Sequence, residues 1–282
     1  MSIVVNNNIA SLNAQRSLNV NTKNLSKTFE RLSSGYRINS ASDDAAGLSI
    51  SEGLRSQIRG NDQAIKNIQD GTNMLQIAEG GLTVINDNLQ RIRELCVQAA
   101  NDSYGTSEKD AILSEIGQRL EDITRTAKTS TFNGIQLLSA ATSKTVLQVG
   151  AGSAASINTL DLKAALPNAT ASSLNLDIST IVASTWTGNN VRSFLDKIDA
   201  ALTTIISKRS ILGAYQNRLD SSLQNMTVMN ENLTASESRI RDLDIAKETA
   251  SMTKYQILQQ ASVSILSQSN KLPQLALSLL QG

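Results

Sequence analysis

The sequence predicts a mainly α protein: a long antiparallel coiled-coil helical bundle with paired N- and C-terminal helices and a small β-hairpin region in the middle. Three observations predict this fold. Apolar residues recur every seven positions in long stretches, aromatic residues make up only 3% of the chain, and Pro167 and Pro273 are its only prolines. Aliphatic side chains fill the holes between paired helices without large rings, and a scarcity of proline permits long helices.

The strongest heptad pattern lies in the C-terminal half. Its successive apolar positions are Ile198, Ile205, Leu212, Leu219, Met226, Leu233 and Ile240. Leu202 and Leu223 occupy the complementary positions of the seam. Three polar residues, Arg209, Gln216 and Asn230, interrupt these positions. An unbroken series of this length predicts one coiled-coil helix of roughly 60 Å, whose polar seam residues lower stability and help to fix the register.

A second seam is expected in the first half of the chain, in two stretches that alternate by three and four residues. They are Ile65, Ile68, Thr72 and Leu75, followed by Leu82, Ile85, Leu89, Ile92, Cys96 and Ala99. The frame slips between them beside Gly80 and Gly81, which together weaken a helix by roughly 1–2 kcal/mol. After a turn at 101–105, Ser107 is expected to cap a third helix. Its apolar stripe is Leu113, Ile116, Leu120, Ile123 and Ala127.

Both ends of the chain are expected to be helical as well. The N-terminal stripe consists of Leu18, Leu25, Phe29 and Leu32. The C-terminal stripe consists of Leu258, Ala261, Ile265, Leu272, Leu275 and Leu279. Pro273 should kink the second of these helices. Neither end can bury its stripe alone, so each needs a partner helix.

The middle of the chain, from about 130 to 190, has a different character, because helical periodicity fades there and small polar residues dominate. Residues 145–149 and 156–162 are expected to form short strands around the turn-forming segment 150–152. The low-complexity segment 164–188 is expected to lie far from either seam, as a surface excursion or an insert of variable length.

Composition leaves little equipment for catalysis. The chain has no histidine, the commonest general base and catalytic metal ligand, and one cysteine, Cys96, which cannot form an intramolecular disulfide. A net charge of +1 gives no general electrostatic reason to bind nucleic acid or an anionic membrane. No apolar run approaches the length of a membrane span, and the first eight residues do not resemble a secretory signal.

Asp43 and Asp44 form the one tight carboxylate pair that invites a catalytic interpretation. A glycosidase would also need a second, opposed carboxyl group and a sugar cleft. The favoured alternative is that Ser42 caps a helix whose first turn carries both acids, where the helix dipole favours them. Gly35 would then end the preceding helix, which leaves 36–41 as a connector. Cys96, on the seam, is expected to be a buried structural thiol.

Six stretches of the chain, in this order, resemble bacterial flagellin, the filament protein of the flagellum. They are LSSGYRINSASDDAAG at 32–47, NLQRIRELCVQAAN at 88–101, TFNG at 131–134, LGAYQNRL at 212–219, QILQQA at 256–261 and LPQLALSLL at 272–280. The resemblance covers about residues 1–163 and 190–282. One departure is Cys96, where the family pattern has alanine.

The resemblance implies an architecture. Residues 1–42 and 243–282 should pair as the inner tube of the filament, with the two terminal stripes as assembly contacts between subunits. Residues 43–242 should form a rod-like outer-tube domain, with a β-hairpin near 145–162 and a short variable segment near 164–188. Large variable outer domains have no room in this chain. The connector motif of the family falls on Arg37, Asn39, Asp43 and Asp44.

The resemblance also implies a function and partners. The chain should be a non-enzymatic subunit, without cofactors, that polymerises into the extracellular flagellar filament for swimming. It should leave the cell unfolded through the flagellum's own export channel, without a cleaved signal peptide. The implied partners are copies of itself, an export chaperone at the C-terminal region, the filament cap and hook-associated proteins. Neither nucleic acid nor a membrane is an expected partner.

Some members of the flagellin family are recognised by a vertebrate Toll-like receptor. The positions that match the family's receptor contacts, together with one neighbour, are Arg91, Leu95, Gln98 and Glu115. Two alternatives to a flagellin remain at this point. The hook–filament junction protein shares the terminal architecture, although the intact signature of 37–47 and the complete ending favour flagellin. A metalloprotease insert of the kind some flagellins carry needs a His-Glu-x-x-His helix, which a chain without histidine cannot form.

Overall fold

The computed structural model describes residues 7–101, 103–139, 145–176 and 188–280, with the backbone alone at 188–189 and 272–280. The chain divides into two compact units. The terminal unit contains residues 1–56 and 232–282, and the rod unit contains residues 57–231. Two long helices, α2 (Ala45–Ala99) and α5 (Gly188–Arg241), contribute residues to both units.

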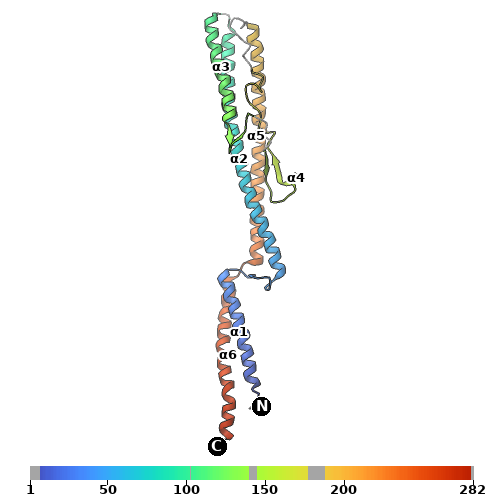
Figure 1. The fold of residues 1–282 in the computed structure, drawn as a ribbon, viewed down its shortest axis with the longest axis vertical. Helices are drawn as coiled ribbons and strands as arrows, with labels where there is room; N and C mark the ends of the chain where they lie inside the picture. The colour runs from blue at the N-terminus through green and yellow to red at the C-terminus, as the bar shows by residue number, and fades with distance from the viewer. Residues whose placement is uncertain (1–6, 102, 140–144, 177–187, 281–282) are drawn as a thin grey trace. The chain divides into compact units, whose positions relative to one another are not determined.

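The terminal unit is built on two helices, α1 (Ile9–Ser34) and α6 (Ile245–Leu280), that lie side by side and antiparallel (Figure 1). The side chain of Asn8 caps α1 by accepting a hydrogen bond from the backbone N–H of Ser11 at 3.0 Å. Gly35, in the left-handed conformation at φ 74°, ends the helix as predicted. The helix α6 continues through Pro273 to Leu280.

The seam between α1 and α6 is made mostly of small and polar residues. On α1 the buried and half-buried positions that alternate by three and four are Ser11, Ala14, Leu18, Asn21, Leu25, Thr28 and Leu32. On α6 they are Glu248, Met252, Tyr255, Gln259, Ser262, Leu266 and Ser269. The apolar stripe read from the sequence of α6 lies one residue out of this frame. Leu258 and Ile265 are therefore exposed, at 38% and 57%.

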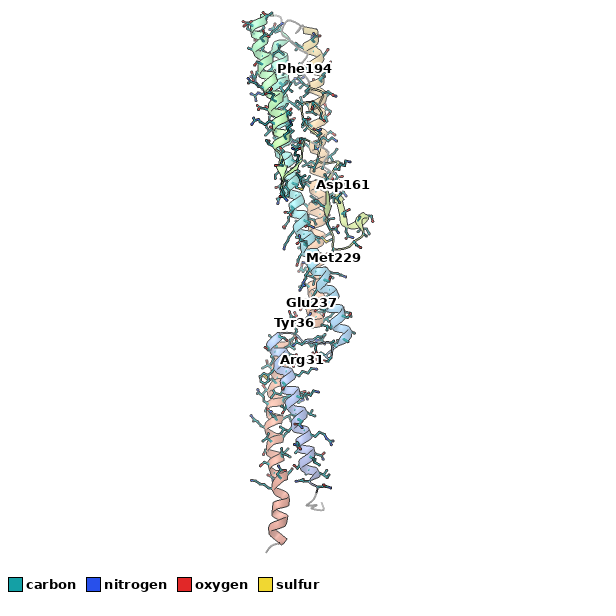
Figure 2. All side chains as sticks on the ribbon, in the orientation of Figure 1. Arg31, Tyr36, Asp161, Phe194, Met229 and Glu237 are labelled. Atoms are coloured by element: carbon teal, nitrogen blue, oxygen red, sulfur yellow. The ribbon has the colours of Figure 1, made fainter. Side chains whose placement is uncertain are left out.

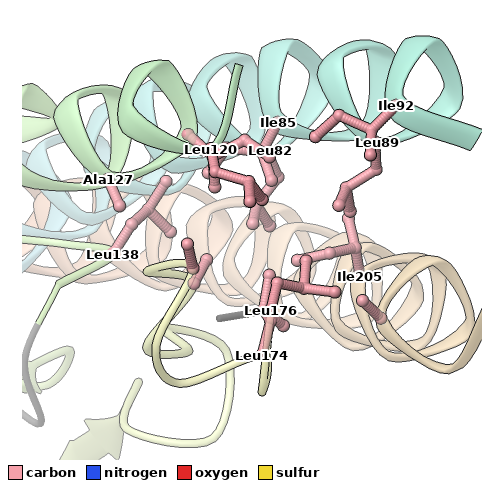
Figure 3. Close-up of a cluster of buried hydrophobic side chains, with 14 of the residues drawn as sticks. Leu82, Ile85, Leu89, Ile92, Leu120, Ala127, Leu138, Leu174, Leu176 and Ile205 are labelled. Carbon is pink, nitrogen blue, oxygen red and sulfur yellow. The ribbon is translucent and has the colours of Figure 1, made fainter. Parts of the chain in front are cut away.

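The rod unit has a core shared by α2, α5 and α3 (Thr106–Thr129) (Figure 3). The seam of α2 is Ala64, Ile68, Gly71, Leu75, Ala78, Leu82, Ile85, Leu89, Ile92, Cys96 and Ala99, all of them buried. This series alternates by three and four without interruption. The predicted slip of the frame is therefore wrong, because Ala78 fills the missing position. Ile65 and Thr72, which the sequence favoured, are only half-buried next to Ala64 and Gly71.

The predicted heptad series on α5 is confirmed. Its members from Ile198 to Leu219 are buried, Val191 extends the series by one heptad, and the positions from Met226 onward are half-buried. Two of the polar seam residues find partners on α2. The Gln216 amide donates to Glu79 at 3.0 Å, and the Asn230 amide donates to Asp62 at 2.7 Å. These bonds fix α5 antiparallel to α2 within the rod unit.

The stripe predicted for α3 is confirmed, since all five of its residues are buried together with Ile112. The predicted cap is wrong. The helix begins at Thr106, its N-cap residue is Gly105, and no side-chain hydrogen bond caps it. Ser107 lies inside the first turn.

Two small hairpins follow α3. The first, β1 (Thr131–Phe132) with β2 (Ile135–Gln136), turns on Asn133 and Gly134, whose φ angles of 47° and 75° are those of a tight Asn-Gly hairpin. The second pairs β3 (Val146–Gln148) antiparallel with β4 (Thr159–Asp161), which confirms the hairpin predicted there. A single turn of helix, α4 (Ala155–Asn158), lies between them, and this hairpin runs beside α5 (Figure 1).

The segment after β4 does not lie away from the core, so the expectation of a surface excursion is wrong for residues 164–176. Its buried members are Ala165, Leu166, Ala169, Thr170, Ala171, Leu174 and Leu176. The backbone N–H of Ala169 donates to Leu138 O at 2.7 Å and thereby ties the segment to the chain that follows β2. The rest of the low-complexity stretch, 177–187, lies outside the described residues.

Candidate assembly faces and connector

The connector between α1 and α2 pairs with the chain that joins α5 to α6. Tyr36 and Asp242 form an antiparallel bridge. The N–H of Arg37 donates to Arg241 O at 2.7 Å, and the N–H of Leu243 donates to Gly35 O at 3.1 Å. These backbone bonds join segments that are about two hundred residues apart in sequence. Main-chain hydrogen bonds therefore hold these two connecting segments of the terminal unit together.

The side chain of Arg241 joins α2 to these two paired segments. Its guanidinium lies over the ring of Tyr36, with Cζ 4.7 Å from the ring centroid, and its Nη1 is 2.5 Å from Oε1 of Glu52 on α2. Only 11% of the Arg241 side chain is exposed. The hydrogen bond from Arg241 lowers the pKa of Glu52 below its ordinary value.

Asp43 is the electrostatic centre of the connector. Its Oδ1 is 2.5 Å from the ammonium of Lys27, and its Oδ2 accepts the backbone N–H groups of Asn39 and Ser40, both at 3.3 Å. Arg31, labelled in Figure 2 near Tyr36, reaches Asp43 at 3.9 Å and Glu248 of α6 at 3.8 Å. The hydrogen bond from Lys27, assisted by the two backbone donors and opposed by burial, lowers the pKa of Asp43 from 3.8 to about 2.

Asp44 caps α2, and the prediction that Ser42 does so is wrong. The Oδ1 atom of Asp44 accepts the backbone N–H of Gly47 at 2.8 Å, and the helix begins at Ala45. Neither acid of the pair lies in the first turn, because Asp43 turns back to bind the connector instead. Gly47 is buried, and a Cβ there would lie 2.8 Å from Cδ1 of Ile38, so glycine lets the connector pack against the start of α2.

The two remaining residues of the connector motif hold the connector against neighbouring helix ends. The guanidinium of Arg37 donates to the carbonyl of Ile240, and the amide of Asn39 donates to the carbonyl of Glu30 at 3.5 Å. Residues that carry no signal in the sequence complete the site. Lys27, Glu52 and Glu248 come from three different helices, so sequence proximity could not reveal them.

The predicted assembly residues have different surroundings. Leu25 is buried at 8% exposure, Leu18 and Leu32 are half-buried, and Phe29 is 49% exposed. Phe29, Leu258 and Ile265 are among the large apolar residues of the α1–α6 pair that are exposed outside its buried core, and this set is called the outward apolar face. Its members are Ile9, Leu12, Val20, Phe29, Ile245, Ile257, Leu258, Val263 and Ile265. The side chains of Leu272, Leu275 and Leu279 lie outside the described residues.

Comparison with known proteins decides the family. Residues 5–143 match the bacterial flagellin N-terminal helical region, and residues 195–280 match the C-terminal helical region. A flagellin of Halalkalibacterium halodurans is 43% identical over 99% of this chain and 100% of its own length. The chain belongs to the bacterial flagellin family. A Bacillus subtilis flagellin is 41% identical over 98% of this chain and 99% of its own length.

Membership gives this flagellin its function: it is a structural subunit that self-assembles into the extracellular flagellar filament for motility. The Halalkalibacterium relative aligns with this chain over 280 residues and over its whole length, so this is a short flagellin. A protein described as a flagellar hook-associated protein of Vibrio parahaemolyticus superposes with a TM-score of 0.59 over 71% of this chain and all of its own. That protein is only 18% identical, so the similarity shows the fold alone. Nothing here favours the junction-protein alternative.

The four positions suggested as a receptor epitope of this flagellin do not share one surface. Arg91 donates to Glu94 at 2.9 Å and to Glu115 on α3 at 3.3 Å, and these bonds raise its pKa. Gln98 is exposed. Leu95 is only 2% exposed and belongs to the core of the rod unit. Leu95 is therefore buried in this structure while Arg91, Gln98 and Glu115 are accessible, and the receptor epitope stays a prediction.

Within the described residues of this flagellin, no group of three or more histidine, cysteine, aspartate or glutamate side chains could hold a metal ion. None of the described helices is long and apolar enough to cross a membrane. Cys96 is fully buried in the α2 seam, as predicted, and burial raises its pKa to about 12.

Proposed function

We propose that this flagellin polymerises through the outward apolar face of its α1–α6 pair, which meets the equivalent helices of neighbouring copies. Residues 1–42 and 243–282 would then form the inner tube, and residues 43–242 the outer tube. The observation that carries the proposal is that the α1–α6 pair reverses the usual distribution of polar and apolar side chains. Its inner seam holds polar and small side chains, while nine large apolar residues are between 38% and 65% exposed. Exposed apolar clusters of this kind mark interfaces between proteins.

The free energies expected for burial and for association fit a reversible polymer. Burying one leucine, isoleucine or phenylalanine side chain stabilises by about 1.5–3 kcal/mol. Several such side chains per subunit outweigh the entropy lost on association, which is commonly 4–15 kcal/mol. A contact in which one surface meets a different surface of the next copy generates a helical polymer when the rotation between copies does not close into a ring.

The test replaces Phe29 and Ile265 by serine, singly. Each variant should raise the critical concentration for polymerisation by about 10- to 150-fold, the equivalent of the lost burial. Filament yield is measured by sedimentation and electron microscopy, and the rod unit is monitored by thermal unfolding. Ile265→Leu is the matched control, because it preserves the apolar area and should polymerise normally. An unchanged critical concentration in both serine variants would exclude the outward face as the contact.

Export and partners belong to the same proposal. A terminal pair with few buried apolar side chains gains most of its order on joining neighbours. The whole subunit passes unfolded through the flagellum's own channel, before the rod unit folds. The export chaperone covers the C-terminal region, 245–280, before assembly, and the filament cap and hook-associated proteins meet the same terminal helices. We propose no enzymatic activity and no cofactor. Loss of secretion, with normal synthesis, after deletion of 245–280 would support the chaperone site, and undiminished secretion would contradict it.

A Toll-like receptor of the vertebrate host is a second proposed partner, supported by the exposed ion pair of Arg91 and Glu115 on adjacent helices. Arg91→Ala should reduce signalling in a cell reporter assay. Arg125→Ala is the control, because it removes another exposed ion pair, with Asp122, from the rod unit. Leu95 is left intact, since a cavity there would disturb the core. Equal signalling by the Arg91→Ala protein and the unaltered chain would refute the epitope.

A further inference from the structure

The inner seam of the α1–α6 pair carries a polar layer near its middle. The amide of Asn21 donates to Oγ of Ser262 at 3.1 Å, and the amide of Gln259 donates to Oγ1 of Thr22 at 3.2 Å. Ser262 is only 7% exposed. Asn21, Gln259 and Ser262 therefore occupy seam positions where a coiled coil ordinarily places leucine, whereas Thr22 lies beside the seam and is exposed.

A second polar layer lies nearer the start of α1. The amide of Asn8 donates to the carbonyl of Ser269 at 2.7 Å, and Oγ of Ser11 donates to Oδ1 of Asn270, also at 2.7 Å. Ser269, one heptad after Ser262, is 6% exposed. The polar contacts thus recur along the pair, and they link residues of α1 and α6 that are more than 230 positions apart in sequence.

Such layers lower stability but discriminate between registers. A slide of α6 by seven residues in one direction would place Asn21 against Tyr255 in place of Ser262. This slide separates Asn21 from the buried Ser262, and an unpaired buried polar group costs about 1–3 kcal/mol. A slide in the opposite direction would place Asn21 against Ser269, another serine, so the layer penalises the first slide more strongly. The outward apolar face supplies no equivalent penalty, because aliphatic side chains accept many neighbours.

We propose that Asn21 and Ser262, supported by Thr22 and Gln259, are specificity-determining residues of terminal-helix pairing, and that they exclude the register in which α6 slides to bring Tyr255 against Asn21. The outward face binds neighbouring copies and the inner polar layer decides the alignment. This inference rests on the proposed use of the outward face in assembly. It assigns the selection of register to a small set of hydrogen bonds and not to the apolar stripes.

The test reads the register directly in assembled filaments of the full chain. Ser11→Cys with Asn270→Cys reports the observed register, because these side chains are in contact. Ser11→Cys with Val263→Cys reports a slide of one heptad. Each pair is placed in the otherwise unaltered chain and in a chain with Asn21→Leu and Ser262→Leu. Disulfide formation within one chain is quantified by mass spectrometry, and the buried Cys96 does not compete.

The unaltered seam should give only the disulfide between positions 11 and 270. The two leucines should raise the disulfide between positions 11 and 263 to a comparable amount. Exclusive formation of the first disulfide in the leucine chain would overturn the inference. The matched control, Asn19→Leu with Ser264→Leu, makes the same chemical change at exposed positions and should leave the ratio unaltered. A scrambled register in this control would also overturn it.

An exchange of partners gives an independent readout. Asn21→Ala alone should allow the second disulfide to form. Asn21→Ser with Ser262→Asn restores a hydrogen-bonded pair in the opposite orientation and should restore the first disulfide as the main product. If the exchanged pair gives the same ratio of the two disulfides as Asn21→Ala, the inference is contradicted. Filament yield is recorded separately, because a loss of yield with an intact register argues against the proposed assembly face and not against the polar layer.

Discussion

The guanidinium of Arg241 lies 4.7 Å from the ring centroid of Tyr36, and this stacking joins the end of α5 to the connector that follows α1. The same guanidinium binds Glu52 of α2. One side chain thus holds three segments of the terminal unit together. It does so beside the backbone bridge of Tyr36 and Asp242, so loss of the side chain leaves a specific and local weakness.

Arg241→Ala should loosen the connector without unfolding the helices. A desolvated cation–π contact is worth about 1–2 kcal/mol, so the connector should open roughly 5- to 30-fold more often. Amide hydrogen exchange across 35–44 measures this opening. Arg239→Ala is the control, because Arg239 makes only an exposed hydrogen bond with Ser236. Equal exchange in the two variants would show that the stacking contributes nothing.

The carboxylate of Asp43 should give the terminal unit a defined acid sensitivity. Its folded pKa of about 2 lies below the ordinary value of 3.8, so its contribution to stability is fully present above 3.8 and is lost as the pH falls through 2. Asp43→Asn should therefore destabilise the unit at neutral pH and make little difference near pH 2. Thermal unfolding as a function of pH measures the difference. A constant difference between the variant and the unaltered chain at every pH would contradict the assignment.

Adjacent glycines in α2 should respond in opposite directions to alanine. A Cβ at Gly80 meets nothing within 4 Å, so Gly80→Ala should stabilise the helix by about 0.5–1 kcal/mol. A Cβ at Gly81 would lie 2.5 Å from Oγ of Ser130 and 2.7 Å from Cδ1 of the buried Leu138, so Gly81→Ala should destabilise by about 1–3 kcal/mol. Urea unfolding of the two variants decides the matter. Stabilisation by both alanines would mean that the segment after α3, which contains Ser130 and Leu138, moves away from position 81 without loss of stability.

The helices and their pairing could be predicted from sequence because heptad periodicity reports directly on burial. The α5 series was found correctly for this reason. The α2 seam was misread at Ala64, Gly71 and Ala78, because small residues give no apolar signal. They are needed there nonetheless: a Cβ at Gly71 would overlap Leu147 of β3, so the hairpin approaches α2 through the missing side chain.

Tertiary contacts account for what the sequence could not reveal. The connector cluster brings together Lys27 of α1, Asp43 of the connector and Glu248 of α6, and no local sequence pattern encodes that contact. The polar seam of α6 was hidden because its apolar residues point outward, which inverts the usual assumption that apolar means internal. The first hairpin, by contrast, has a readable sequence signal in Asn133 and Gly134, the preferred residues of a two-residue turn.

Cys96 should behave as an unreactive thiol in the folded rod. It is fully buried, and burial raises its pKa to about 12, so almost no thiolate is available to react. Labelling by a thiol-specific disulfide reagent should be slow in native conditions and should become fast in denaturant. The native rate then reports how often the rod unit opens. Rapid stoichiometric labelling of the native chain would show that the α2 seam is open at this position.

The terminal unit should lose its order in dilute monomer while the rod unit keeps it. The reason is energetic: the α1–α6 seam buries few apolar side chains and relies on polar contacts, whereas α2 and α5 share a continuous aliphatic core. Amide hydrogen exchange should therefore be fast across 9–34 and 245–271 and slow across 64–99. On polymerisation the terminal helices should become protected, because neighbouring copies then cover their outward apolar face. Strong protection of residues 9–34 in a verified monomer would mean that the polar seam alone is sufficient, and that assembly does not complete the pair.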